Sequence, residues 1–126
     1  MINDTIHLHP YKDAILRQNI LYKHMMPENI CFRIESDLCG CIMLYDISKI
    51  SKDVVASSVD VVADSKRDGH RPWIFVKSDA LGMDFGVNLY RFSFIHEHTH
   101  DIIEYWCQIT LMDNDADRSY VYMQGV

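Results

Sequence analysis

No stretch of this sequence approaches the roughly 20 consecutive apolar residues that a membrane-spanning helix requires. The N-terminal segment, residues 1–5, also lacks the basic region, apolar core and small-residue cleavage site of a secretion signal. These absences predict a protein without a membrane anchor, either cytoplasmic or assembled into a particle.

An excess of positive charge is also missing. The 126 residues include 18 acidic and 12 basic side chains, which gives a formal net charge of −6 at pH 7. Nucleic-acid affinity comes mainly from Lys and Arg side chains that neutralise phosphates, so this balance disfavours nucleic acid as a partner. The one basic cluster, residues 65–71, contains Asp68-Gly69, a pair that is typical of a solvated turn.

The chain has four cysteines but no C-x-x-C motif. Cys39 and Cys41 are separated by one residue, and no second close pair completes a zinc site. A chain of this length does not need disulfides to stabilise it, and no secretion signal points to an oxidising compartment. We therefore expect free thiols, with Cys41 and Cys107 in the core.

Familiar catalytic motifs are absent as well, since the sequence has no P-loop, no G-x-G-x-x-G and no G-x-S-x-G. Its 48 % hydrophobic and 24 % charged residues are typical of a globular protein. A length of 126 residues fits one domain, 1–126, with a substantial core. Residues 1–10 show no clear period and form either an extended arm or a short strand.

One helix is predicted, over residues 11–25. Ala14, Gln18, Leu21 and Met25 fall on one stripe at helical spacing. Pro10 suits the start of a helix, and Pro27 stops it. We expect this amphipathic helix to pack its stripe against the core.

Most of the remaining sequence favours β-strands. Apolar residues alternate with polar ones, or β-branched residues are enriched, over several segments. These segments are 31–35, 39–47, 53–64, 72–77, 88–96, 102–112 and 119–124. The sequence therefore predicts a mainly β fold, a single-domain antiparallel sandwich or barrel of about six or seven strands with one N-terminal amphipathic helix.

The longest alternating pattern covers residues 88–112. Tyr90, Phe92 and Phe94 share one parity in the first half. In the second half, apolar residues such as Tyr105 and Cys107 alternate with polar ones. Two long alternating segments joined near residues 99–101 predict a β-hairpin.

The tip of that hairpin carries a match to the zinc-protease pattern H-E-x-x-H. On a helix, His96 and His100 would lie one turn apart and share a zinc ion, with Glu97 activating the bound water. The surrounding aromatic and β-branched residues favour a strand over a helix. A zinc-dependent hydrolase that uses these three residues is thus the alternative function.

A second metal hypothesis needs no helix. On an extended strand His96, His98 and His100 point the same way, and with a carboxylate such as Glu104 they could bind zinc or another transition metal. The competing interpretation places all three histidines in a solvated hairpin tip. Apart from this zinc, the sequence indicates no cofactor.

Aromatic residues offer a different function, because aromatic side chains dominate protein interfaces. Trp106 lies on the polar parity of its strand, so it either faces a partner or is covered by the N-terminal helix. Tyr120 and Tyr122 share one face of the last predicted strand. These three are the predicted interface residues.

The leading hypothesis is a non-enzymatic structural or interaction module. It would act with protein partners as a subunit of a homo-oligomer or larger assembly. Small β-rich chains with arms and long hairpins are common in virus particles and phage tails, so we expect a component of this kind.

Overall fold

The computed structural model describes residues 5–34, 42–50, 54–57, 67–68, 71–96 and 98–113. These residues form nine β-strands and three short 3₁₀ helices. In chain order they are β1 (Thr5–Leu8), η1 (Lys12–Leu16), β2 (Ile20–Tyr22), η2 (Lys23–Met25), β3 (Asn29–Ile34), β4 (Ile42–Lys49), β5 (Val54–Ser57), β6 (Arg67–Asp68), β7 (Arg71–Lys77), η3 (Ser78–Leu81), β8 (Gly86–His96) and β9 (Ile102–Met112).

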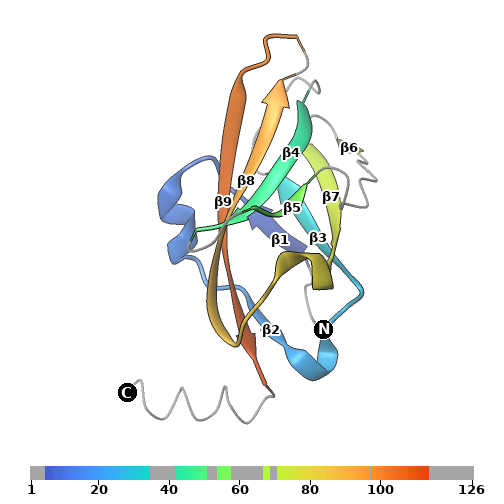
Figure 1. The fold of residues 1–126 in the computed structure, drawn as a ribbon, viewed down its shortest axis with the longest axis vertical. Helices are drawn as coiled ribbons and strands as arrows, with labels where there is room; N and C mark the ends of the chain where they lie inside the picture. Colours follow the sequence, from blue (N-terminus) through green and yellow to red (C-terminus); the bar gives the residue numbers. More distant parts are fainter. Residues whose placement is uncertain are drawn as a thin grey trace.

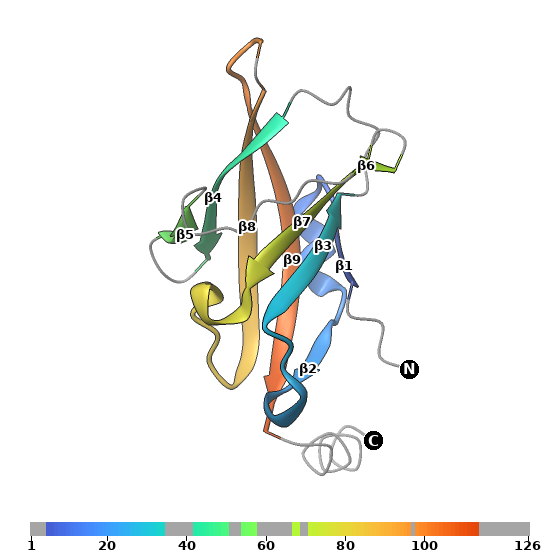
Figure 2. The same ribbon diagram turned by 90° about the vertical axis from the view of Figure 1, so that its right-hand side faces the viewer.

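The strands form two sheets, with the orders β1-β3-β7-β6 and β2-β9-β8-β4-β5. They lie as two layers, β1, β3 and β7 against β8 and β9 (Figures 1 and 2). The predicted mainly β fold is confirmed. The predicted purely antiparallel pairing is wrong, because β1 pairs with β3 and β2 with β9 in parallel. Parity identifies the face of a strand but not its direction, and the long connections from β1 to β3 and from β2 to β9 permit parallel pairing.

Aromatic side chains fill the space between the sheets. Phe32 of β3 meets Phe92 of β8 with ring centroids 4.7 Å apart, and Phe94 packs edge-on to Tyr105 at 5.4 Å. Buried residues of both sheets join these rings in one hydrophobic cluster. Two sheets with a shared core are consistent with a β-sandwich. Within the described residues neither sheet closes on itself.

The predicted helix over residues 11–25 is wrong. That segment contains η1, the short strand β2 and η2, and the described residues include no α-helix. Isolated helices of about 15 residues are marginal, and here β2 pairs instead with the edge of β9. The predicted stripe identified some of the core residues of this segment. Ala14 and Leu21 are buried, but Met25 is 45 % exposed.

The predicted hairpin is confirmed. β8 and β9 pair antiparallel from Gly86↔Leu111 to Ile95↔Ile102. The tip is closed by a hydrogen bond from the His96 N–H to the Asp101 carbonyl. His100 adopts a left-handed conformation there, with φ of 61°.

The other predicted strands agree in most places. β3, β4 and β7 overlap the predicted segments 31–35, 39–47 and 72–77, and β5 covers part of 53–64. Residues 5–8 form a strand rather than a free arm. The segment 119–124 lies outside the described residues, as do Cys39 and Cys41. Cys31 and the buried Cys107 are free thiols, and no helix in the described ranges is long and apolar enough to cross a membrane.

Candidate functional site

The hairpin tip holds its histidines in a turn. His96 is the last residue of β8, and its Nδ1 accepts hydrogen bonds from the backbone N–H groups of His98 at 3.2 Å and Thr99 at 3.3 Å. The imidazole therefore caps the backbone of the turn, with Nδ1 as an acceptor. His98 and His100 are exposed.

This geometry does not provide the zinc clamp that H-E-x-x-H requires. The His100 N–H donates to the His96 carbonyl at 2.9 Å, so a single turn joins the two residues. His96 nevertheless ends strand β8 and His100 has a left-handed φ of 61°, so the pair does not belong to the α-helix that the zinc motif requires. The second metal hypothesis required His96, His98 and His100 to lie on one extended strand, but strand β8 ends at His96. The rings of His96 and His98 are close, with centroids 5.9 Å apart. Glu97 lies outside the described residues, which themselves contain no group of three potential metal ligands.

The Trp106 side chain is covered rather than exposed. Its side chain is 8 % exposed, its backbone N–H donates to the His9 carbonyl at 3.0 Å, and Lys12 Nζ lies 5.4 Å from the ring centroid. A cation over an indole face is favourable. The sequence left two alternatives for Trp106, and the covered one is right, although a 3₁₀ segment replaces the predicted helix.

Residues 9–19, which we call the crossing segment, are attached to β9 by three further hydrogen bonds. Asn19 Nδ2 donates to the Gln108 carbonyl at 2.7 Å, and the Asn19 carbonyl accepts from the Thr110 N–H at 2.7 Å. Gln108 Nε2 donates in turn to the Ile15 carbonyl at 2.8 Å. The crossing segment therefore covers both the outer face and the edge of β9 at these residues.

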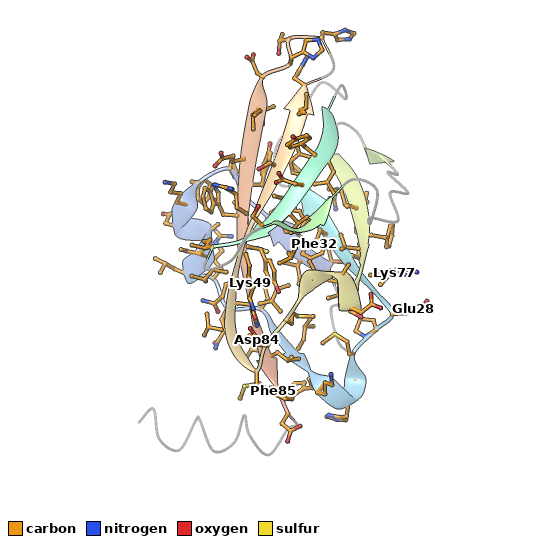
Figure 3. The ribbon with its side chains drawn as sticks, viewed as in Figure 1. Glu28, Phe32, Lys49, Lys77, Asp84 and Phe85 are labelled. Carbon is orange, nitrogen blue, oxygen red and sulfur yellow. The ribbon has the colours of Figure 1, made fainter. Side chains whose placement is uncertain are left out.

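A buried lysine was missed by the sequence analysis. Lys49 Nζ lies 2.7 Å from Asp84 Oδ2 and 3.0 Å from the Gly82 carbonyl oxygen (Figure 3). Gly82 ends η3 in the left-handed conformation, with φ of 57°, which favours glycine. These bonds fix the loop between η3 and β8 to β4. No local pattern connects residues 35 positions apart.

The neighbouring titratable groups are protonated structural groups. Tyr90 donates to the Leu81 carbonyl at 2.8 Å, and burial, followed by nearby Cys107 and Asp84, raises its pKa. Burial alone raises the pKa of the Cys107 thiol. Nucleophilic catalysis requires a lowered pKa or an adjacent base, so neither group is activated.

Within the described part of the chain, the distal end of β9 has an unpaired backbone edge. In β9 the N–H of Trp106 points away from β8, toward His9, and the strand alternation places Ile102 and Glu104 on the same side. No described strand pairs with these two residues. We call Ile102 and Glu104 the open edge. The Ile102 side chain is 61 % exposed, and the hairpin extends beyond the four-stranded sheet (Figure 2).

No protein-family model, curated protein sequence or solved structure matches the chain, so its function is inferred from its own residues.

Proposed function

We propose that the protein is a non-enzymatic structural and interaction module with a β-sandwich architecture. It acts through protein partners as a subunit of a homo-oligomeric or larger assembly, and a component of a virus or phage particle is the setting that we favour. The observation that carries this proposal is the open edge of the projecting β8–β9 hairpin.

An unpaired strand edge is a template for another strand. Its free N–H and C=O groups can extend the sheet into a neighbouring chain, and exposed apolar side chains add affinity. Both hairpin strands are 11 residues long, about twice the usual strand length. The crossing segment occupies the edge of β9 near Trp106 and Thr110, so docking is directed to Ile102 and Glu104.

The charge of Glu104 restricts which strand can dock. A carboxylate on an edge disfavours indiscriminate pairing and favours a partner that presents a basic residue opposite it. Tyr120 and Tyr122 lie outside the described residues and stay predicted interface residues in this proposal.

The test is the mass of the protein in solution, measured by light scattering after gel filtration over a concentration series. We expect an oligomer that Ile102→Lys and Glu104→Pro reduce to smaller species. The Glu104 N–H points away from β8, so proline there removes no bond of the hairpin. Val87→Lys is the matched control, since Val87 is 62 % exposed at the opposite end of the same hairpin.

Two results would contradict the proposal. One is a wild-type protein that stays monomeric at every concentration, both alone and in an extract of its native source. The other is a mass that falls equally in Ile102→Lys and Val87→Lys. Thermal unfolding of each variant separates loss of assembly from loss of folding.

A further inference from the structure

A hollow of about 400 Å³ lies between β1 and the crossing segment. It is lined by His7, His9, Ala14, Arg17 and Asn19. Strand alternation explains the two histidines, because Ile6 and Leu8, which alternate with His7 and His9, face the core. Its volume falls at the lower end of the range for small-molecule sites.

Arg17 is held in place at this hollow by two side chains. Its Nη1 lies 3.0 Å from His9 Nε2, and its Nη2 donates to the Tyr11 hydroxyl at 3.5 Å. The His9 and Tyr11 rings stack with centroids 5.3 Å apart, and Tyr11 Oη lies 3.2 Å from His9 Nδ1. The guanidinium is therefore oriented before any ligand arrives.

The donor and acceptor roles follow from the chemistry of the guanidinium. Arginine has five N–H donors and no acceptor, so His9 Nε2 must accept from Arg17. A neutral imidazole then carries its proton on Nδ1 and donates it to the Tyr11 oxygen. These contacts use two guanidinium N–H groups, and in them the Tyr11 hydroxyl acts only as an acceptor, so its own proton remains available. The cluster therefore retains hydrogen-bond donors and a positive charge.

None of the described residues that line the hollow is a carboxylate, although the whole protein carries a net charge of −6. A guanidinium in a fixed orientation recognises planar or tetrahedral oxyanions through paired charge-assisted hydrogen bonds. We propose that this hollow binds a small ligand through an oxyanion, either a carboxylate or a phosphate. Arg17 supplies the charge, and the Tyr11 hydroxyl helps to orient the guanidinium by accepting from its Nη2.

Isothermal titration calorimetry at constant ionic strength tests this proposal with two probes, inorganic phosphate and succinate. We expect saturable binding of at least one probe, and the probe that binds more tightly identifies the source of the oxyanion. Arg17→Gln should weaken binding about tenfold or more, because a hydrogen bond to a charged group contributes about 1.5–3 kcal/mol. Tyr11→Phe, which keeps the stacked ring, should weaken it less.

Lys23→Gln is the matched control. It removes the same charge from an exposed residue outside the hollow and should change affinity less than about twofold. No saturable binding of either probe, or equal losses in Arg17→Gln and Lys23→Gln, would overturn the proposal. Glu104→Pro should leave binding unchanged, so this test is independent of the assembly.

Discussion

The ammonium of Lys49 lies 2.7 Å from a carboxylate oxygen of Asp84, although the two side chains differ greatly in exposure, 5 % against 66 %. The cation is held inside the protein, where it also donates to the Gly82 carbonyl at 3.0 Å, while its counter-ion faces water. Solvent screens such a pair, so its net contribution to stability is modest.

Replacing Asp84 should lower the stability of the protein more than replacing Lys49. Asp84→Asn leaves the buried ammonium with a weaker partner and should lower the free energy of unfolding by about 1 kcal/mol. Lys49→Met removes the desolvated charge and keeps the volume, so stability should stay within about 1 kcal/mol of the wild type. Urea unfolding measures both variants. A larger loss for Lys49→Met than for Asp84→Asn would contradict this account.

Asn88 should be one of the least replaceable polar residues. Its side chain is buried, with Oδ1 accepting from the Asp84 N–H and Nδ2 donating to the carbonyls of Asp84, Gly86 and Ile109. Asn88→Ala should cost about 2–4 kcal/mol, because several buried backbone groups lose their partner.

Asn88→Asp provides a sharper comparison. The carboxylate keeps the acceptor but would face three carbonyl oxygens without a donor, so it should destabilise the protein more than alanine at pH 7. Urea unfolding gives the order of the two variants. Equal stability of the wild type and Asn88→Asp would show that the Nδ2 bonds contribute nothing.

Stability should decline in alkaline solution. Tyr90 and Cys107 face each other across β8 and β9, and burial raises the pKa of both above their ordinary values of 10.0 and 9.0. The unfolded chain releases these protons at a lower pH than the folded protein. The free energy of unfolding should therefore fall above about pH 9, by at most about 1.4 kcal/mol per pH unit for each group.

Single substitutions separate the two contributions. Cys107→Ala should flatten the decline that begins near pH 9, whereas Tyr90→Phe should flatten the part above pH 10. A thiol reagent should leave Cys107 unmodified in the native protein at neutral pH, because the buried thiol is protonated. Rapid native-state modification of Cys107 would contradict its burial.

The crossing segment should detach locally when one of its bonds to β9 is removed. Asn19→Ala deletes the 2.7 Å bond to the Gln108 carbonyl, which contributes about 1 kcal/mol. Hydrogen exchange at the Trp106 N–H, which bonds to His9, should then accelerate about fivefold. Gln18→Ala, at an exposed neighbouring residue, should leave the rate unchanged.

Much of the sheet structure could be predicted because burial imposes a period of two on the residues themselves. Tyr90, Phe92 and Phe94 lie on one face since that face meets the core, and the same parity placed Tyr105 and Cys107 opposite them. The hairpin could be predicted for a second reason. Its two strands are adjacent in sequence, so their pairing depends only on a short turn.

The errors arose where distant partners decide the structure. The stripe that contains Ala14 and Leu21 is compatible with a helix, in which the backbone groups of this segment would bond to one another. In the structure these groups bond to the edge of β9 instead. The same docking covers Trp106, which parity alone left open. The Lys49–Asp84 pair joins β4 to a loop after η3, and no local pattern encodes such a contact.

The parallel pairing of β2 with β9 has a consequence for the time at which the structure can form. Asn19 and Gln108 are 89 positions apart. During synthesis the crossing segment therefore cannot form its bonds to β9 until β9 has left the ribosome. Until then Leu21 has no strand to join, and contacts of this range close late in folding. In a Trp73→Phe background, the fluorescence of Trp106 should report burial under the crossing segment after the hairpin has formed. The crossing segment and β2, which are made long before β9, are then among the last elements to reach their final positions.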